Sequence, residues 1–426
     1  MDVVVKKSEI FGEAKVPPSK SYTHRAFISA SLSRKTRIAN PLISGDTLAT
    51  LKACKKIGAE FFRKKYFFEF RGTDEIFGGY FNFENSGTTL RIFTGLLSLS
   101  TDESVLDGDN SLRTRPNKEL VVALSKLGAK ASGDELFRAP FKIRGIIKGG
   151  EVEIAAPSSQ FISSLLYSLP LAKFDSFVKI ISTKSRPYID VTLEVLEKSG
   201  IKIEKEENGF FIPSEQEFNL KSFEVPADFS SASYLIAAGI IAGEVRITNA
   251  FDSRQGDKKI VEICKEMGAD VKWDKEKGLI VAKKSELHAI SFDASDTPDL
   301  VPAVAILSAI ADGISEIYNA EHLRIKEVDR IRCIATNLRA LGVEVDEMKD
   351  GLRIKGGKSE FFGSVQSFGD HRIALAFSLL GLLGEVTVRG CEVVSISYPN
   401  YFETLKSLGA KLELNYQDIP DRERIY

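Results

Sequence analysis

The sequence predicts an α/β protein made of six copies of one repeat, grouped as two domains of three repeats. Two series of positions recur along the 426 residues at intervals of 67 to 74 residues. In the first series an amphipathic helix closes on glycine, at Gly58, Gly128, Gly200, Gly268, Gly342 and Gly409. In the second series an apolar helix begins with a polar entrance, at Lys20, Gly87, Gln160, Ser231, Asp299 and His371. One unit of about 70 residues explains both series.

The second half of each repeat is predicted to be a helix, a glycine and a hairpin. In TLEVLEKSGIKIEKEENGFFIP, residues 192–213, the helical period gives way to alternation just after Gly200. Glycine suits the left-handed end of a helix. The segments IKIE and FFI are therefore predicted to be strands that meet at the ENG turn.

The first half of each repeat contains an apolar helix. Segments such as DTPDLVPAVAILSAIADG are apolar on nearly all faces, so these helices belong inside a domain. If three of them pack side by side, their N-terminal dipoles and free N–H groups emerge on one face, where an anion can bind. Dipoles alone are too weak to hold a multiply charged ligand, and the entrances add cations: Lys20, Arg25, Arg91, Arg115, Arg330 and Arg372.

Composition limits the kinds of partner. Lys and Arg total 58 against 59 acidic residues, so nothing in the net charge of -1 favours nucleic acid or a membrane surface. The start MDVVVKKSEIFG has no apolar stretch of signal-peptide length, and we expect a soluble, cytoplasmic protein. The four cysteines and four histidines are far apart, so buried thiols are favoured over a metal site.

Several entrances combine residue types that bind anions. VPPSKSYTHRAF places Lys20, Ser21 and Arg25 at a helix start, and NSGTTLR places Gly87 where a ligand could approach the backbone. LDGDNSLRTRP carries Arg113 and Arg115, whose side chains can fork around a phosphate or carboxylate. Each motif alone also fits a plain structural role, such as a capped helix with solvated charges.

Serine hydroxyls and two acidic positions complete the candidate site. PSSQF offers Ser158 and Ser159 at one helix start, of which one is expected to be a cap, and STKSRPY adds Ser185 and Tyr188. Asp299 lies at the second position of an apolar helix. IKEVDRIR supplies Lys326, Glu327, Asp329 and Arg330. A carboxylate among cations can act as acid or base, although Glu327 and Arg330 could equally be a surface ion pair.

These motifs together resemble the enolpyruvyl transferase family, and within it the synthases that act on shikimate 3-phosphate. The match runs in order through PSKS…R, NSGT…R, LDG…RP, SSQF, SRPY, DFSSASY, PD, KEVDR and DHR, with a weaker tail at SYPNYF. It covers nearly the whole chain. The resemblance implies a two-domain inside-out α/β barrel with six βαβαββ repeats, three per domain.

The resemblance also implies how the chain divides. Residues 15–226 would form the N-terminal lobe with repeats 1 to 3. Residues 1–14 plus 227–426 would form the C-terminal lobe with repeats 4 to 6. The active site is expected in the interdomain cleft, and a monomer is expected.

The family reaction joins phosphoenolpyruvate to the 5-hydroxyl of shikimate 3-phosphate and releases phosphate, a step of the shikimate pathway toward chorismate and the aromatic amino acids. It needs no metal or organic cofactor.

The positions expected to bind shikimate 3-phosphate are Lys20, Ser21, Arg25, Ser158, Ser159, Gln160, Ser185, Asp299 and Lys326. Those expected to bind phosphoenolpyruvate are Lys20, Gly87, Arg115, Gln160, Arg330 and Arg372. Asp299, Glu327 and Lys20 are the expected catalytic residues, with Asp299 as the base and Glu327 as the donor of a proton to the methylene carbon.

One position departs from the family pattern. The family usually has Lys just before the Ser-Tyr-Pro tripeptide, where this chain has Ile396. Unless another cation substitutes, we expect weaker binding of phosphoenolpyruvate and reduced sensitivity to its mimic glyphosate.

Three other functions remain open from the sequence. An enolpyruvyl transferase acting on UDP-N-acetylglucosamine would carry a reactive Cys in the LDGDNSLRTRP loop, where none occurs. An RNA 3′-terminal phosphate cyclase would need a nucleotide site and a basic track, and neither is visible. A descendant that only binds ligand is favoured by Ile396 alone, whereas Lys20, Asp299, Glu327, Arg330 and Arg372 are all present.

Overall fold

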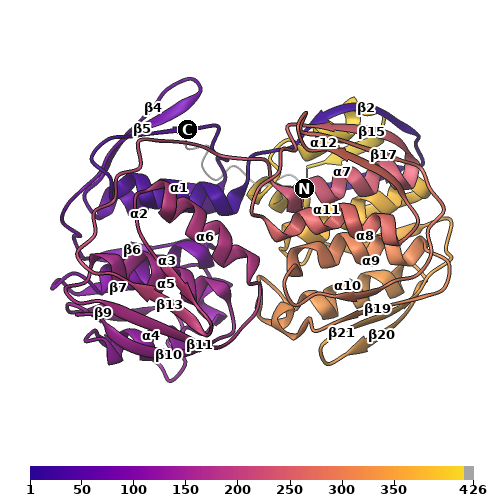
Figure 1. Cartoon of the computed structure of the whole chain (residues 1–426). Coiled ribbons are helices and arrows are strands. Elements are labelled where there is room, and N and C mark those ends of the chain that lie inside the picture. The colour runs from indigo at the N-terminus through magenta and orange to yellow at the C-terminus, as the bar shows by residue number, and fades with distance from the viewer. Residues whose placement is uncertain (417–426) are drawn as a thin grey trace. The chain divides into compact units, whose positions relative to one another are not determined.

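The computed structural model describes residues 1–416, which divide into two compact units (Figure 1). Unit 1 holds Met1–Pro17, Ala227–Asp252 and the chain from Asp257 onward. Unit 2 holds Pro18–Pro226 and Ser253–Gly256. In residues 1–416 the strands form six four-stranded sheets, three in each unit.

Unit 2 contains helices α1 to α6 and three sheets. The helices are α1 (Lys20–Ser31), α2 (Gly45–Lys56), α3 (Gly87–Leu97), α4 (Lys118–Lys126), α5 (Ser159–Ser168) and α6 (Pro187–Lys198). The first sheet has the order β14 (Ser222–Glu224), β3 (Thr36–Ala39), β5 (Phe67–Arg71) and β4 (Glu60–Arg63). The second has β6 (Tyr80–Asn82), β7 (Ser104–Asp107), β9 (Phe141–Arg144) and β8 (Lys130–Ser132). The third has β10 (Gly150–Ala156), β11 (Ser176–Thr183), β13 (Gly209–Ile212) and β12 (Glu204–Glu206).

Unit 1 repeats this plan. Its helices are α7 (Phe229–Ala242), α8 (Ile260–Glu266), α9 (Val301–Ile310), α10 (Arg330–Ala340), α11 (His371–Leu380) and α12 (Tyr401–Ser407). One sheet has the order β2 (Ile10–Lys15), β15 (Gly243–Thr248), β17 (Leu279–Lys283) and β16 (Asp270–Asp274). The next has β18 (Ser291–Asp293), β19 (Ile314–Tyr318), β21 (Gly351–Lys355) and β20 (Glu344–Met348). The last has β22 (Phe362–Gln366), β23 (Glu385–Arg389), β1 (Asp2–Lys6) and β24 (Lys411–Asn415).

All six sheets share one pairing pattern. The first two strands in each order run parallel and the later neighbours run antiparallel, as in β10·β11, β11·β13 and β12·β13. Within a repeat, as in β6–α3–β7 and β10–α5–β11, a helix supplies the crossover that a parallel pair needs. The parallel pairs β14·β3 and β2·β15 instead join strands that lie far apart in the chain. The repeated order confirms the predicted α/β class and the six repeats.

Two sheets of unit 1 are completed by the N-terminus of the chain. β2 pairs in parallel with β15, with Ala14 opposite Ile247. β1 lies between β23 and β24 in the last sheet. In Figure 1 the indigo strand β2 accordingly lies beside β15, with β17 beyond β15. In unit 2, β14 provides the matching first strand for the sheet that contains β3.

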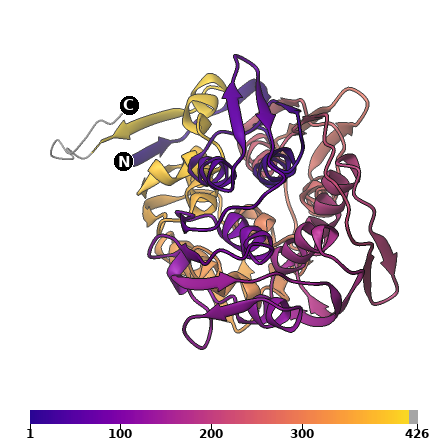
Figure 2. The same cartoon turned by 90° about the vertical axis from the view of Figure 1, so that its left-hand side faces the viewer.

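Within each unit, alternate helices form the interior. All residues of α7 and α11 are buried, and α3, α5 and α9 are nearly as enclosed. Figure 2 views unit 2 with several helices end-on and strands outside them. A side chain at Gly95 of α3 would lie 2.6 Å from the Ser164 hydroxyl of α5, so the glycine allows these two helices to pack closely.

The six predicted helix-closing glycines all have positive φ, between 77° and 117°. One strand begins later than predicted: β12 starts at Glu204, the last residue of IKIE, residues 201–204. Ile201 instead donates its N–H to the carbonyl of Leu196 and packs into the core. An apolar residue just beyond a left-handed glycine commonly closes a helix in this way.

Among residues 1–416, no helix has both the length and the apolar composition that crossing a bilayer requires.

Candidate active site

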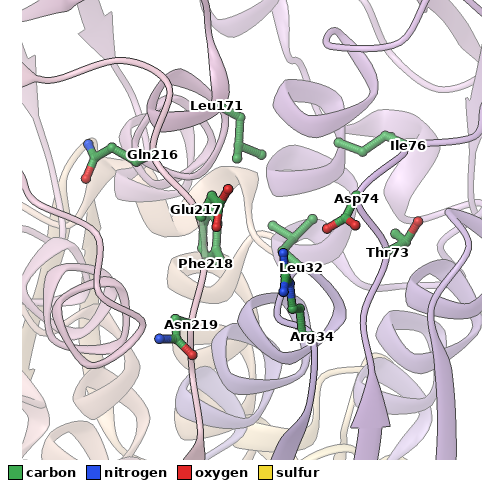
Figure 3. A pocket seen from close by; sticks show the side chains of 10 residues that line it. All are labelled: Leu32, Arg34, Thr73, Asp74, Ile76, Leu171, Gln216, Glu217, Phe218 and Asn219. Carbon is green, nitrogen blue, oxygen red and sulfur yellow. The ribbon is translucent and has the colours of Figure 1, made fainter.

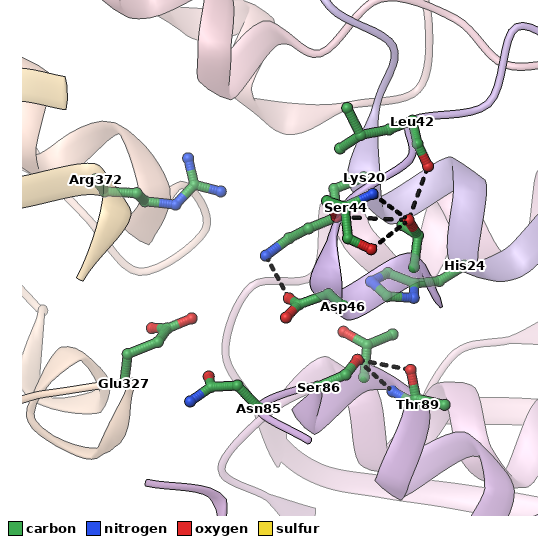
Figure 4. Close-up of polar contacts among 12 residues, drawn as sticks. Lys20, His24, Leu42, Ser44, Asp46, Asn85, Ser86, Thr89, Glu327 and Arg372 are labelled. Atoms are coloured by element: carbon green, nitrogen blue, oxygen red, sulfur yellow. Dashed lines mark hydrogen bonds and ion pairs between the residues drawn. The ribbon is translucent and has the colours of Figure 1, made fainter. Parts of the chain in front are cut away.

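The entrance of α1 carries the first predicted cation. Ser19 caps the helix by accepting the N–H of Tyr22, which leaves Lys20 as its first residue. The ammonium group of Lys20 lies 2.8 Å from a carboxylate oxygen of Asp46, near the start of α2 (Figure 4). Both side chains are largely buried, at 14% and 11% exposed. Lys20 is thus held at the helix end by a partner that the sequence analysis did not include.

Arg25 is a buried cation held by neutral groups. Its guanidinium donates to Thr192 at 2.8 Å, to Ser163 at 3.4 Å, and to the backbone carbonyls of Ser21 and Tyr188 at 2.9 and 3.2 Å. Burial lowers the pKa of Arg25. None of these hydrogen bonds goes to a carboxylate, and a buried charge of this kind favours binding of an anion.

Gly87 begins α3 among polar side chains. A Cβ placed there would lie 3.1 Å from Arg115 Nη1, 3.6 Å from Gln160 Oε1 and 3.7 Å from Arg91 Nη1. Arg91 donates to Gln160 Oε1 at 2.6 Å, and Gln160 donates to the Thr88 hydroxyl at 3.0 Å. The structure therefore brings together three of the predicted phosphoenolpyruvate residues around one helix N-terminus, where the first N–H groups suit an anion.

The predicted serines have different local roles. Ser158 caps α5 by accepting the N–H of Gln160 at 3.3 Å, and Ser159 is the first residue of that helix. Ser185 has a φ of 60°, a left-handed conformation that is rare for serine, and is 5% exposed. Such strain persists where the surroundings fix the backbone, which is common at binding sites.

Arg330 of unit 1 is the centre of a buried charge cluster. Its Nε donates to Asp370 at 2.6 Å, its Nη1 to Asp299 at 2.8 Å and its Nη2 to Glu327 at 2.7 Å. The side chain is 1% exposed. Burial disfavours the charge, but the three carboxylates together raise the pKa of Arg330. The Glu327–Arg330 pair is therefore part of a buried network and not the surface ion pair considered from spacing alone.

Asp299 is shared by two arginines. It lies in the 3₁₀ turn Pro298–Leu300 just before α9, and its second oxygen accepts from Arg372 Nη2 at 2.8 Å. Burial would raise its pKa, but Arg372, Lys326 and Arg330 hold that pKa well below the ordinary value of 3.8. In this arrangement Asp299 is ionised but a weak base, because both oxygens already accept hydrogen bonds.

Asp257 is a second acidic group in this cluster. It is 2% exposed and accepts a hydrogen bond from the Ser230 hydroxyl. Burial and, after it, the charge of Asp299 raise its pKa to about 7, although Ser230 and Arg372 oppose the rise. The folded protein therefore retains a proton here at pH values where an exposed Asp has lost it.

This raised pKa predicts a pH-dependent effect of Asp257→Asn. Between about pH 4 and about pH 7 the unfolded chain releases the Asp257 proton while the folded chain keeps it, so wild-type stability falls as pH rises. Asn cannot ionise, so the variant does not lose stability in this way as the pH rises. The free energy of unfolding of the variant minus that of the wild type should rise across this window and then level off. Urea unfolding at a series of pH values measures it, and a flat difference would contradict the raised pKa.

Some residues of these clusters were absent from the predicted site. Arg91 was counted among the entrance cations but not assigned to a ligand. Asp46 and Asp370 were not singled out, although each lies at a helix start, where an acidic residue is common. By contrast, Arg113 of the same loop as Arg115 forms a bidentate pair with Asp107 at 2.9 and 2.8 Å, and so has a structural partner.

A pocket in unit 2 lies away from the predicted site residues. Its volume is about 550 Å³, and it lies near the C-terminal end of α1 (Figure 3). It is lined by Leu32, Arg34, Thr73, Asp74, Ile76, Leu171, Gln216, Glu217, Phe218 and Asn219. None of these is a predicted site residue. The candidate active site is therefore placed at the helix entrances and not at this pocket.

Ile396 ends the 3₁₀ segment Cys391–Ile396 and is half-buried. The weaker binding of phosphoenolpyruvate and glyphosate that it suggests stays a prediction.

Comparison with known proteins agrees with this geometry. The family model described as EPSP synthase (3-phosphoshikimate 1-carboxyvinyltransferase) matches residues 4–405. A 3-phosphoshikimate 1-carboxyvinyltransferase of Archaeoglobus fulgidus is 63% identical, with 97% of this chain and 99% of that protein covered. One of Methanosarcina mazei is 46% identical over 99% and 100% of the two chains.

Solved structures give the same result. EPSP synthase from Acinetobacter baumannii superimposes with a TM-score of 0.82 at 27% identity and covers 97% of this chain and 100% of its own. The enolpyruvyl transferase NikO from Streptomyces tendae, with a TM-score of 0.79, 16% identity, and 97% and 98% coverage, shows the shared fold. With its motifs, its repeats and a family match over nearly its whole length, the chain belongs to the EPSP synthase family.

Proposed function

We propose that this chain transfers the enolpyruvyl group of phosphoenolpyruvate to the 5-hydroxyl of shikimate 3-phosphate, giving 5-enolpyruvylshikimate 3-phosphate and phosphate. The observation that carries the proposal is Asp299, a carboxylate whose two oxygens are held by Arg330 and Arg372 at 2.8 Å each. Anionic substrate groups can compete for these guanidinium groups, and the carboxylate they release becomes a stronger base. The reaction belongs to the shikimate pathway, which leads to chorismate and the aromatic amino acids.

Shikimate 3-phosphate is assigned to residues that carry hydroxyls and cations. They are Lys20, Ser21, Arg25, Ser158, Ser159, Gln160 and Ser185 of unit 2, with Asp299 and Lys326 of unit 1. The neutral surroundings of Arg25 support this assignment, because a phosphate or hydroxyl would supply the acceptor that a buried guanidinium favours.

Phosphoenolpyruvate is assigned to four cations, one glycine and one glutamine, of which Lys20 and Gln160 are shared with shikimate 3-phosphate. They are Lys20, Gly87, Arg115 and Gln160 of unit 2, with Arg330 and Arg372 of unit 1. The neighbourhood of Gly87 supports this choice, since Arg91 and Arg115 lie beside a helix N-terminus that has no side chain to block a ligand. Arg91 joins this group on the same evidence.

The reaction is an addition followed by an elimination, with two proton transfers in each half. In the addition Asp299 takes the proton of the 5-hydroxyl while the 5-oxygen bonds to the central carbon of phosphoenolpyruvate, and Glu327 gives a proton to the methylene carbon. In the elimination the tetrahedral intermediate returns a proton of the new methyl group to Glu327 and expels phosphate, which takes the proton held by Asp299. Lys20 stabilises the charge that develops on the substrates. This division between Asp299 and Glu327 is part of the proposal.

The proposal extends to the organisation and setting of the protein. The lobes proposed are residues 15–226 and residues 1–14 with 227–426, which differ from the two compact units only at residues 15–17 and 253–256, and side chains of both act on the same two substrates. The chain is a monomer of the cytoplasm that uses no metal or organic cofactor and binds no nucleic acid or membrane. Light scattering after size-exclusion chromatography tests the monomer directly, because a dimer would elute with twice the mass.

Phosphate release from phosphoenolpyruvate tests the function. We expect release with shikimate 3-phosphate and none with UDP-N-acetylglucosamine as the parallel acceptor. Release with the sugar nucleotide alone would favour the related transferase. No phosphate release with either acceptor, from folded protein that still binds shikimate 3-phosphate, would point to a chain that only binds its ligand.

Gly87→Ala tests the phosphoenolpyruvate position. The added methyl group would lie 3.1 Å from Arg115 Nη1, in the space assigned to the ligand. We expect the KM for phosphoenolpyruvate to rise about tenfold or more, which corresponds to about 1.4 kcal/mol, and the KM for shikimate 3-phosphate to change little. Steady-state kinetics with each substrate varied in turn measures both constants.

The matched control is Gly45→Ala. Gly45 is also the first residue of a helix, and a side chain there meets no atom within 4 Å. It should leave both constants near their wild-type values. Equal effects of the two substitutions would remove Gly87 from the proposed site.

A further inference from the structure

A buried chain of polar side chains links three helices in unit 2. His24 Nδ1 of α1 lies 2.7 Å from the Thr50 hydroxyl of α2. That hydroxyl lies 2.7 Å from the Thr89 hydroxyl of α3, which is 2.6 Å from the hydroxyl of Ser86, the cap of α3. All four side chains are at most 1% exposed. Figure 4 shows His24, Ser86 and Thr89 close to the Lys20–Asp46 pair.

The protons of this chain have one favourable direction. Each hydroxyl has a single proton, so if Ser86 donates to Thr89, Thr89 to Thr50 and Thr50 to His24 Nδ1, every hydroxyl proton has an acceptor. The reverse direction leaves the buried Ser86 proton without an acceptor among the described residues. A buried donor left unpaired is costly. In this direction the Thr50 proton has two acceptors, His24 Nδ1 at 2.7 Å and the backbone carbonyl of Asp46 at 3.3 Å.

This direction matters at the start of α3. With its proton turned inward, Ser86 keeps a lone pair for the N–H of Thr89, at 3.3 Å. The cap then satisfies that N–H group, and the earlier N–H groups of the helix remain directed out of its end beside Gly87. The ring of His24 stays neutral at physiological pH, because burial lowers its pKa to about 3; Asp46 opposes this, and Lys20 and Arg25 reinforce it. His24 therefore remains a neutral hydrogen-bond partner of the Thr50 hydroxyl.

We propose that His24, Thr50 and Thr89 are positioning residues that act through Ser86: they hold the entrances of α1 and α3 in register and thereby set the affinity for phosphoenolpyruvate. The inference rests on the proposed function, which assigns that ligand to the entrance around Gly87. Lys20 begins α1 one turn before His24, and Gly87 follows Ser86 directly. A shift between these helices would therefore separate groups that are assigned to one ligand.

Isosteric removal of the hydroxyls tests this inference. Thr50→Val and Thr89→Val should each raise the KM for phosphoenolpyruvate about tenfold, while the KM for shikimate 3-phosphate stays within about twofold of the wild type. Thr50→Ser and Thr89→Ser retain the hydroxyl and should restore the wild-type KM. Thr94→Val is the matched control, because among residues 1–416 this buried hydroxyl of α3 bonds only to the Leu90 carbonyl of its own helix.

Substitutions of His24 provide a second readout. The side-chain amide of Asn occupies the position of Nδ1, whereas that of Gln reaches the position of Nε2. His24→Asn should therefore keep a KM for phosphoenolpyruvate near that of the wild type, and His24→Gln should resemble the valine variants. The pH dependence of this KM should be the same in His24→Asn and in the wild type, since the ring does not titrate in the working range.

Two results would overturn the inference. One is a KM for phosphoenolpyruvate that is unchanged in folded Thr50→Val and Thr89→Val. The other is an equal rise of both KM values with no rescue by serine, which would make the chain merely structural. If Gly87→Ala raises the KM for phosphoenolpyruvate and the valine variants do not, only the inference fails. If Gly87→Ala has no effect either, the proposed site fails with it.

Discussion

Asp299→Asn should abolish most turnover while the protein still binds shikimate 3-phosphate. Asn cannot accept the proton of the 5-hydroxyl, and loss of a general base typically costs about 10² to 10⁴-fold in kcat. Only one side-chain oxygen would remain for Arg330 and Arg372, which now share two at 2.8 Å each. Asp299→Ala should behave alike. Steady-state kinetics gives kcat, and titration calorimetry gives the Kd for shikimate 3-phosphate.

Asp293→Asn serves as the control for Asp299→Asn. Asp293 is a half-buried carboxylate of the same unit that accepts a hydrogen bond from Asn319 at 2.9 Å and is not a predicted site residue. Its loss should leave kcat near the wild-type value. Near-normal turnover of Asp299→Asn would show that another group takes the proton. A comparable loss in both variants would mean that the effect is general disruption of unit 1.

Arg330→Met should strongly destabilise the protein as well as inactivate it. The substitution removes the partner of three carboxylates, including Asp370, which is completely buried. Breaking a buried ion pair by removing one member costs about 3 to 5 kcal/mol, because the remaining charge is left uncompensated. Chemical denaturation of the two proteins measures the change in the free energy of unfolding. Arg330→Lys should lose less, since an ammonium group can still bind one or two of the carboxylates.

Arg324→Met is the matched comparison for Arg330→Met. Arg324 also pairs with two carboxylates, those of Asp329 and Glu347, but its side chain is 25% exposed against 1% for Arg330. Water can solvate the charges left behind there, so we expect a loss of only about 1 kcal/mol. If Arg330→Met lowered the free energy of unfolding no more than Arg324→Met does, the buried cluster would not stabilise unit 1 as described.

The pattern of the fold was predictable because each repeat has the same local physics. Glycines at helix ends and apolar helices recur at one period, and both follow from backbone geometry and burial. The start of β12 was predicted too early because Ile201 looks the same in sequence whether it joins a strand or closes a helix. Only its hydrogen bond to Leu196 and its packing decide between the two.

The residues of the candidate site were predictable from the sequence, but which of their side chains contact one another was not. Family motifs supplied Asp299, Arg330 and Arg372. No local pattern states that one carboxylate lies between two arginines separated from it by 31 and 73 positions. The Lys20–Asp46 pair and the chain from His24 to Ser86 were missed for the same reason. They join different helices, and their chemistry arises only when those helices pack.

The most direct test of the account is the product formed from isotope-labelled phosphoenolpyruvate and shikimate 3-phosphate, followed by carbon NMR together with phosphate release. We predict one phosphate released for each new enol ether, with the label bonded to the 5-oxygen of shikimate 3-phosphate. Phosphate released together with free pyruvate, or consumption of the label without an ether at that oxygen, would contradict the proposed transfer.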